Sequence, residues 1–393
     1  MALRWIIGQF QERRLAQSEL VLFWITAAAI LAFAWLKGPA TSLDSGTFQG
    51  WANGLTNQNF NYLKFFSNND FFTPVYTYTV IISQIAIFKA LFGTFWAHAF
   101  LVCNMVATLA TLILARKICR DAELHPIALC LLWSLFLISV DYLTWPKFIL
   151  SDPLFAFLVL WSTWLTVFRT GHAGTRRTGL FLVSLVLLFL TRPAGAPVIF
   201  VLAPLFFAPS LLDRLLHSRL LLVVLLLLSL AIFLGFANVA HMQIAGRLQA
   251  PSLDYFMDFF KQGMIIHDRH ETWIVYSGTI TGAFEILCWR LIYFFIPFVM
   301  AFSSFHIAMK LLFFVPVYGL IAVGELRYRT KTISHSVARL RGVLLCLIIG
   351  IATYHSLLLI DYDWRYRYPL IAPMLLLAAL HFSDLTKSRK NVV

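Results

Sequence analysis

The segment DYDWRYRYP, at positions 361–369, places charged and aromatic residues in alternation between two apolar stretches. In an extended chain alternate residues lie on one face, so its two aspartates and two arginines would line one side. Arg365 and Arg367 would then offer a row of guanidinium groups to an anion such as phosphate. In a helix, Asp361 and Arg365 would instead pair at a spacing of four residues. The sequence leaves both arrangements open.

Three further polar residues stand beside long apolar stretches: Asp44 in SLDSGTF, Asp152 in LSDPLF and Arg192 in LTRPAG. Each has a structural explanation, because aspartate suits a helix start and an arginine can extend its head group out of a membrane. Each also has a chemical explanation. A partly buried carboxylate can act as a general base, and an arginine can bind phosphate.

Composition defines the setting of these residues. Of the 393 residues, 60% are hydrophobic and 12% are charged, whereas about 25% are charged in soluble domains. Many stretches reach the roughly 20 apolar residues that a transmembrane helix needs. The chain is therefore predicted to be an all-α, polytopic membrane protein with a single domain over residues 1–393.

The formal net charge of +13 has a membrane explanation. Lysine and arginine gather in cytoplasmic loops of membrane proteins, and no basic domain stands apart here, so nucleic acid is not an expected partner. The five cysteines lack CxxC spacing and are expected to be free thiols. The N-terminal arginines precede a full apolar span without a cleavage site, which predicts a cytoplasmic N-terminus and a retained anchor.

Apolar length predicts about ten transmembrane helices, with both termini in the cytoplasm. Two more apolar segments, 77–92 and 290–304, are predicted to lie at the outer face, because a crossing there would place basic loops outside, against the positive-inside rule. The predicted outer loops are about 38–95, 141–152, 240–305 and 361–368. The predicted spans are about 20–37, 96–115, 126–141, 153–168, 178–191, 195–208, 219–239, 306–324, 342–360 and 369–382.

The predicted outer loop IIHDRHETW contains His267, Asp268, His270 and Glu271, and the spacing of its histidines and glutamate resembles part of a metal site. A further well-spaced ligand does not accompany them, and a solvated polar loop is the favoured interpretation. The need for a metal stays open, since a divalent cation could stabilise a phosphate group.

Five short motifs occur in order along nearly the whole chain: LDSGTFQGWANGL, TPVYTYTVIISQIAIFKALFG, ILSDPLFAFLVL, LTRPAG and WRYRYPLIAPMLLL. Together they resemble the GT-C superfamily of membrane glycosyltransferases. The most similar members are bacterial protein-O-mannosyltransferase-like enzymes, including those that modify lipopolysaccharide. The resemblance implies a GT-C-like fold and a sugar donor linked to polyprenyl phosphate.

The resemblance also implies roles for single residues. Asp44 matches the catalytic carboxylate, and Asp152 matches a second acidic position, for substrate or metal, that is commonly Glu in the family. Arg365 or Arg367 matches the phosphate-binding arginine, and Arg192 is a further candidate for that contact. The expected substrate groove contains Asp70, Tyr76, Tyr366 and Tyr368.

The implied reaction moves a sugar to a glycan or lipid acceptor of the cell envelope, at the outer face of the cytoplasmic (inner) membrane. A carboxylate that takes the proton of the acceptor hydroxyl fits an inverting transfer. Two alternatives are a transporter or flippase of lipid-linked sugars, and a polysaccharide polymerase or ligase. The few charges inside the predicted spans and the lack of a sequence repeat disfavour the transporter.

Overall fold

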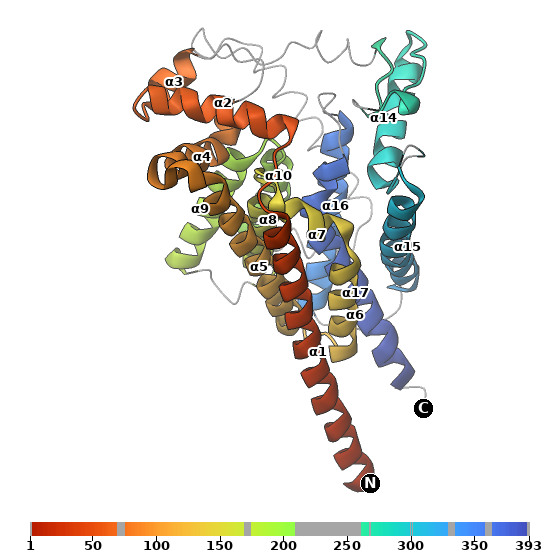
Figure 1. Cartoon of the computed structure of the whole chain (residues 1–393). Helices are drawn as coiled ribbons and strands as arrows, with labels where there is room; N and C mark the ends of the chain where they lie inside the picture. The colour runs from red at the N-terminus through yellow and green to blue at the C-terminus, as the bar shows by residue number, and fades with distance from the viewer. Residues whose placement is uncertain are drawn as a thin grey trace.

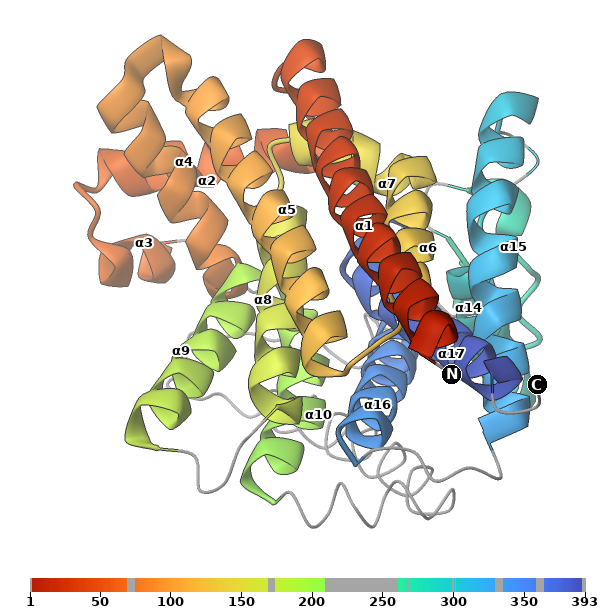
Figure 2. The ribbon, with the colours of Figure 1, turned by 90° about the horizontal axis from the view of Figure 1, so that it is seen from below.

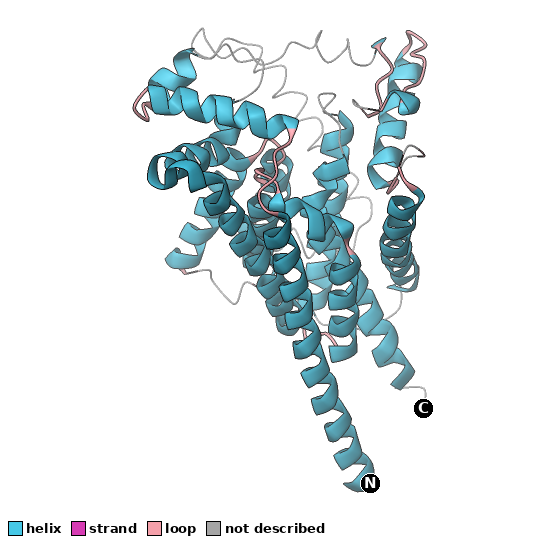
Figure 3. Ribbon diagram, viewed as in Figure 1, coloured by secondary structure: helices cyan, strands magenta, loops and turns pink. Residues whose placement is uncertain are grey.

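A computed structural model gives the fold of most of the chain. In the described part, all helices are α- or 3₁₀-helices and no strand is present (Figure 3). The predicted all-α class is confirmed for these residues. The structure describes residues 2–68, 75–168, 174–208, 261–266, 269–298, 300, 302–328, 335–357 and 364–390.

The core of the fold is α17 (Tyr368–Lys390), whose residues from Leu370 to Leu380 are all buried. A helix that is apolar on all sides needs neighbours on all sides. Four helices that pack against it are α6 (Pro126–Ile138), α8 (Asp152–Val167), α15 (Ser304–Arg327) and α16 (His335–Leu357).

Helix α1 (Ala2–Lys37) is the longest of the described helices, with 36 residues. At 1.5 Å per residue it is about 54 Å long, well beyond the roughly 30 Å of a bilayer core. Its first part projects from the bundle, at the same end as the C-terminal end of α17 (Figure 1).

Five described helical stretches are long and apolar enough to cross a membrane. A sixth results if the bent pair Pro126–Ile138 and Val140–Lys147 forms one span. These helices are compatible with a membrane protein, although they are fewer than the ten predicted spans. The five are Arg14–Lys37, Val75–Asp121, Ser304–Arg327, Ser336–Leu357 and Arg365–Thr386.

Three predicted spans correspond to short helices: α8 with 16 residues, α9 (Thr175–Thr191) with 17 and α10 (Gly195–Phe207) with 13. At 1.5 Å per residue they reach about 20–26 Å, less than the bilayer core. The predicted span at 219–239 lies outside the described residues.

The predicted span at 126–141 is interrupted. Helix α6 ends at Ile138, and α7 (Val140–Thr144) continues at an angle of 58°. The break falls at Ser139, whose backbone is extended and whose hydroxyl accepts a hydrogen bond from the Tyr142 backbone N–H. A serine that caps a new helix explains why one apolar run forms two helices.

The predicted outer-face segment 77–92 corresponds to α4 (Thr79–Phe92), whose 14 residues are too few to cross a bilayer alone. Helix α4 packs against α2 (Leu43–Asn57), and the chain continues from α4 through a 3₁₀ turn into α5 (Trp96–Asp121). Helices α2 and α3 (Tyr62–Asn68) lie at the end of the bundle opposite the N-terminus (Figure 1).

The predicted helix over 290–304 is wrong in its bounds. Helix α14 (Ile280–Phe295) starts earlier and ends before Pro297, and α15 begins only at Ser304. Ile296 is extended, as expected of a residue before proline. In Figure 1, α14 stands above α15 in line with it and does not lie across the bundle.

Near the N-terminal end of the bundle, an ion pair joins α1 to α5, with α6 on the other side of α1 (Figure 2). Arg116 donates two hydrogen bonds of 2.8 Å to the Glu19 carboxylate, and the Trp133 indole donates a third at 3.0 Å. Glu19 is only 3% exposed. A buried carboxylate with three donors holds these three helices in register.

We expect Glu19→Gln to destabilise the fold, because Arg116 would lose its charged partner inside the protein. Loss of one partner of a buried pair typically costs about 3–5 kcal/mol. Thermal unfolding in detergent, followed by tryptophan fluorescence, should show a clear fall in Tm. Lys117→Gln is the matched control, because it breaks the half-exposed pair with Asp121 and should cost about 1 kcal/mol or less. Equal effects of the two changes would contradict the assigned role of Glu19.

Candidate functional site

A short backbone pairing brings the starts of α2 and α8 together. The Ala40 N–H donates to the Lys147 carbonyl at 2.9 Å, and the Ile149 N–H donates to the Ala40 carbonyl at 3.0 Å. The Ser45 hydroxyl adds a bond of 3.0 Å to the Ile149 carbonyl. Two acidic residues that are far apart in sequence therefore belong to neighbouring helix starts.

The first of these acids, Asp44, lies in the first turn of α2 without being its cap. Ser42 is the N-cap, and it exchanges hydrogen bonds with Ser45 in a capping box. The Asp44 carboxylate instead forms an ion pair with Arg365. The cap explanation therefore applies to Ser42, and Asp44 is available for chemistry.

The second acid, Asp152, is the first residue of α8, followed by Pro153. Its carboxylate pairs with Arg192, which follows the last residue of α9. The two side chains are 2% and 6% exposed. Because an unpaired charge is costly in such a place, each residue requires the other.

Tyr366 lies close to the arginine of each pair. The guanidinium carbon of Arg192 is 5.3 Å from the centre of its ring, and that of Arg365 is 5.4 Å away. The two guanidinium carbons are therefore separated by no more than the sum of these two distances. The structure thus assembles Asp44, Arg365, Tyr366, Arg192 and Asp152, which we call the two-pair cluster.

Arg367 points elsewhere. It is 1% exposed and donates to the Phe294 and Ile296 carbonyls, at 3.0 and 2.7 Å, at the C-terminal end of α14. Residues 364–367 form the 3₁₀-helix η6 (Trp364–Arg367). With three residues per turn, positions two apart lie on different faces. The extended arrangement with both arginines on one side is therefore wrong for these residues.

The aspartates of that motif, Asp361 and Asp363, lie outside the described residues, as does Asp70. The remaining candidates for the substrate groove differ in position. Tyr368 is 1% exposed and stacks on Tyr142 at 4.9 Å, so it belongs to the core. Tyr76 is half-buried, and its ring is 5.8 Å from that of Phe189.

Several residues near the two-pair cluster were not singled out from the sequence. His355 stacks on Tyr366, with 4.5 Å between ring centres and planes 10° apart. Tyr354, its neighbour in α16, donates a hydrogen bond of 3.1 Å to the Pro193 carbonyl, next to Arg192. Both occupy the end of an apolar span, and a polar residue in such a place is a signal that sequence reading can use.

A further ion pair joins α15 to α7. Lys310 contacts Asp141 at 2.5 Å, and the positive charge of Arg367 also acts on Asp141. The lysine is 6% exposed. Its position inside the apolar run IAMKLLFF was the sequence signal for a buried partner.

Among the described residues, five cations and three carboxylates lie in or near the two-pair cluster, and Asp361 and Asp363 of the same motif lie outside the described residues. The cations are Arg192, Arg290, Arg365, Arg367 and Lys310, and the carboxylates are Asp44, Asp141 and Asp152.

Metal ligation can be judged only for part of the predicted set. His267 and Asp268 lie outside the described residues, and the His270 ring lies 4.2 Å from that of Trp273. Among the described residues, no three His, Cys, Asp or Glu side chains are grouped as metal ligands. Asp44 and Asp152 each have an arginine as counter-charge.

Comparisons with known proteins add no relative. No family model, no curated protein and no solved structure matches the chain. The functional assignment therefore depends on the geometry of the two-pair cluster and on the resemblance of its motifs.

Proposed function

We propose that the chain is a membrane glycosyltransferase that uses a polyprenyl-phosphate-linked sugar as donor and a cell-envelope glycan or lipid as acceptor. The observation that carries the proposal is the pairing of Asp44 with Arg365 beside the buried pair of Asp152 and Arg192. It places a carboxylate and a guanidinium, the groups required at an acceptor hydroxyl and a leaving phosphate, in direct contact. We propose that this site opens to the outer face of the inner membrane.

The two pairs differ in exposure, and this difference suggests different roles. The Asp44 side chain is 37% exposed, whereas Asp152 and Arg192 are nearly inaccessible. An ion pair that solvent reaches contributes about 1 kcal/mol or less, so a competing anion can separate it. A buried pair is costly to break. We therefore assign the first pair to chemistry and the second to the framework.

In the proposed reaction, the donor phosphate competes with Asp44 for Arg365. The freed carboxylate takes the proton of the acceptor hydroxyl while that oxygen attacks the anomeric carbon. The bond between the anomeric carbon and the phosphate oxygen breaks, and the electron pair leaves with polyprenyl phosphate. Arg365 stabilises the charge that develops on this phosphate. Attack opposite the leaving group inverts the anomeric centre.

Arg192 has a second role in this proposal. Its guanidinium is fixed by Asp152 and lies over the Tyr366 ring, so it contributes positive charge to the donor site. A divalent cation would supply similar charge to a leaving phosphate. Adding a chelator to a transfer assay distinguishes an arginine-based site, which keeps its activity, from a site that needs a metal.

We expect Asp44→Asn to abolish sugar transfer, because the amide cannot accept the proton. Loss of a general base typically lowers a rate by about 10²–10⁴-fold. Mass spectrometry of envelope glycolipids and glycans from a deletion strain carrying the variant should show loss of one sugar-sized increment. Asp121→Asn is the matched control, because Asp121 lies at the far end of α5 and should leave transfer intact. Full transfer by Asp44→Asn would remove Asp44 from the mechanism.

Arg365→Gln and Arg367→Gln should separate catalysis from stability. The first removes the proposed phosphate contact and should lower transfer by about 10²–10³-fold with little change in Tm. The second leaves two carbonyls at the end of α14 without their donor, which costs about 1–3 kcal/mol for each buried group. The main effect of Arg367→Gln should therefore be a lower Tm, and not a loss of transfer by the folded protein. Transfer assays and thermal unfolding of both purified variants test this, and the reverse pattern would exchange the two roles.

A further inference from the structure

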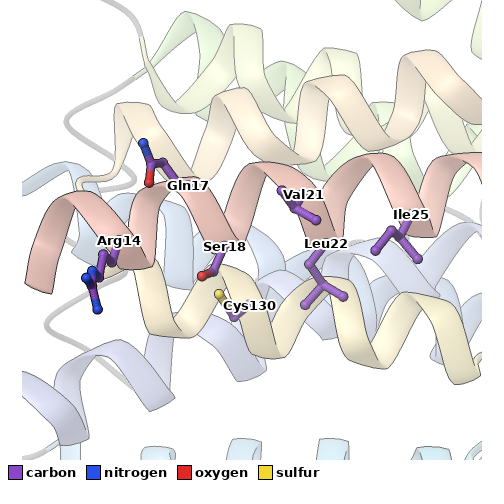
Figure 4. Close-up of a pocket in the computed structure, with 7 residues that line it drawn as sticks. All are labelled: Arg14, Gln17, Ser18, Val21, Leu22, Ile25 and Cys130. Carbon is purple, nitrogen blue, oxygen red and sulfur yellow. The ribbon is translucent and has the colours of Figure 1, made fainter.

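A groove runs along the exposed side of α1, far from the two-pair cluster (Figure 4). Its volume of about 530 Å³ lies within the range of small-molecule sites, about 300–1,000 Å³. Helix α6 contributes Cys130, and the other lining residues come from α1. They are Arg14, Gln17, Ser18, Val21, Leu22 and Ile25.

The α1 residues of the groove follow a helical spacing of three and four, so they form one stripe. The stripe changes character along its length. Arg14, Gln17 and Ser18 offer a charge, an amide and a hydroxyl within the first turn, and the next two turns are aliphatic. Figure 4 shows this order, with Arg14 at one end and Ile25 at the other.

The polar end of the stripe coincides with the edge of the membrane-spanning part of α1. Arg14, Gln17 and Ser18 precede the span predicted at about 20–37, and α1 leaves the bundle on that side. Val21 and Ile25 are 58% and 51% exposed, although they lie inside the span. A groove that is cationic at the membrane surface and apolar below it matches an amphiphile with an acidic head group.

Glu19 follows Ser18 in α1 but does not reach the groove. Its side chain is 3% exposed and pairs with Arg116 of α5. Arg120 also adds positive charge near Glu19. Basic residues beside a span attract anionic lipids by about 1 kcal/mol each near the surface.

We propose that the groove between α1 and α6 binds one anionic phospholipid. Its phosphate accepts hydrogen bonds from Arg14, Gln17 and Ser18, and one acyl chain lies along Val21, Leu22 and Ile25. Cys130 lies beside Ser18, where the head group meets the acyl chain. The site is separate from the proposed transferase chemistry, and it would hold α1 at a fixed depth in the membrane. Charge favours this occupant over a second copy of the chain, because a two-fold interface there would bring the two Arg14 side chains together.

Cys130 provides a direct test, since a lipid bound beside Ser18 covers its thiol. A variant that keeps Cys130 and has alanine at the other four cysteines is placed in nanodiscs of phosphatidylcholine with increasing phosphatidylglycerol. The rate of reaction with N-ethylmaleimide, which is uncharged, is measured. We expect phosphatidylglycerol to slow the reaction in a saturable way, whereas phosphatidylcholine alone does not.

Arg14→Gln in this background should shift the phosphatidylglycerol titration to roughly fivefold higher content, as expected for loss of one interfacial charge. Val21→Trp, at an exposed position, should fill the groove and abolish the dependence. Arg176→Gln, at an exposed position at the start of α9, is the matched control and should leave the titration unchanged.

Native mass spectrometry of the wild-type protein provides a readout that does not depend on the cysteine changes. It should retain one phosphatidylglycerol under conditions that remove phosphatidylcholine, and Arg14→Gln should lose it. Equal labelling rates in both lipids, or an unchanged titration in Arg14→Gln, would show ordinary bulk lipid and overturn the proposal. Protection that depends on protein density and not on lipid charge would assign the groove to a second copy, which also overturns it.

Discussion

Charge neutralisation inside an apolar helix bundle is the constraint on which this structure depends. A buried ion without a partner is too costly to keep, so each charged side chain in the bundle also sets how helices meet. Glu19 ties α1 to α5, and Asp152 ties α8 to the end of α9. Lys310 connects α15 to α7 in the same way. The positions of the charges therefore fix the arrangement of the helices around α17.

The cost of an unpaired buried charge also distinguishes ion pairs that hold helices together from a pair that could take part in a reaction. Pairs that are inaccessible to solvent cannot exchange partners without leaving a bare charge behind, so they are suited to holding helices. The pair of Asp44 and Arg365 is the more accessible of the two in the two-pair cluster. In the proposed reaction, a phosphate replaces its carboxylate and maintains neutrality, while the buried pair keeps its partner.

Sequence reasoning identified the helical class and the apolar span of α17. It also singled out the residues of the two-pair cluster, with Tyr366 assigned to a groove, while their chemistry stays a prediction. It failed where tertiary contacts decide local conformation. Residues 364–367 alternate in polarity like a strand, yet the carbonyls at the end of α14 and the Asp44 carboxylate draw Arg367 and Arg365 in different directions. Pro297 and Lys310 were readable signals, one for a helix end and one for a buried partner. The bounds of α8 and α10 were also readable, because the spans predicted at 153–168 and 195–208 agree with these helices to within one residue.

The two ends of α17 explain how an exchange at Arg365 can leave the fold intact. At the far end, His381 contacts Glu325 at 2.9 Å, and Glu325 also pairs with Arg341, so α15, α16 and α17 are joined. At the near end, Arg367 is bonded to α14. Arg365 lies in η6, outside the regular α-helix and before this anchor. In the proposed reaction, its side chain moves from carboxylate to phosphate while these contacts hold α17 in place.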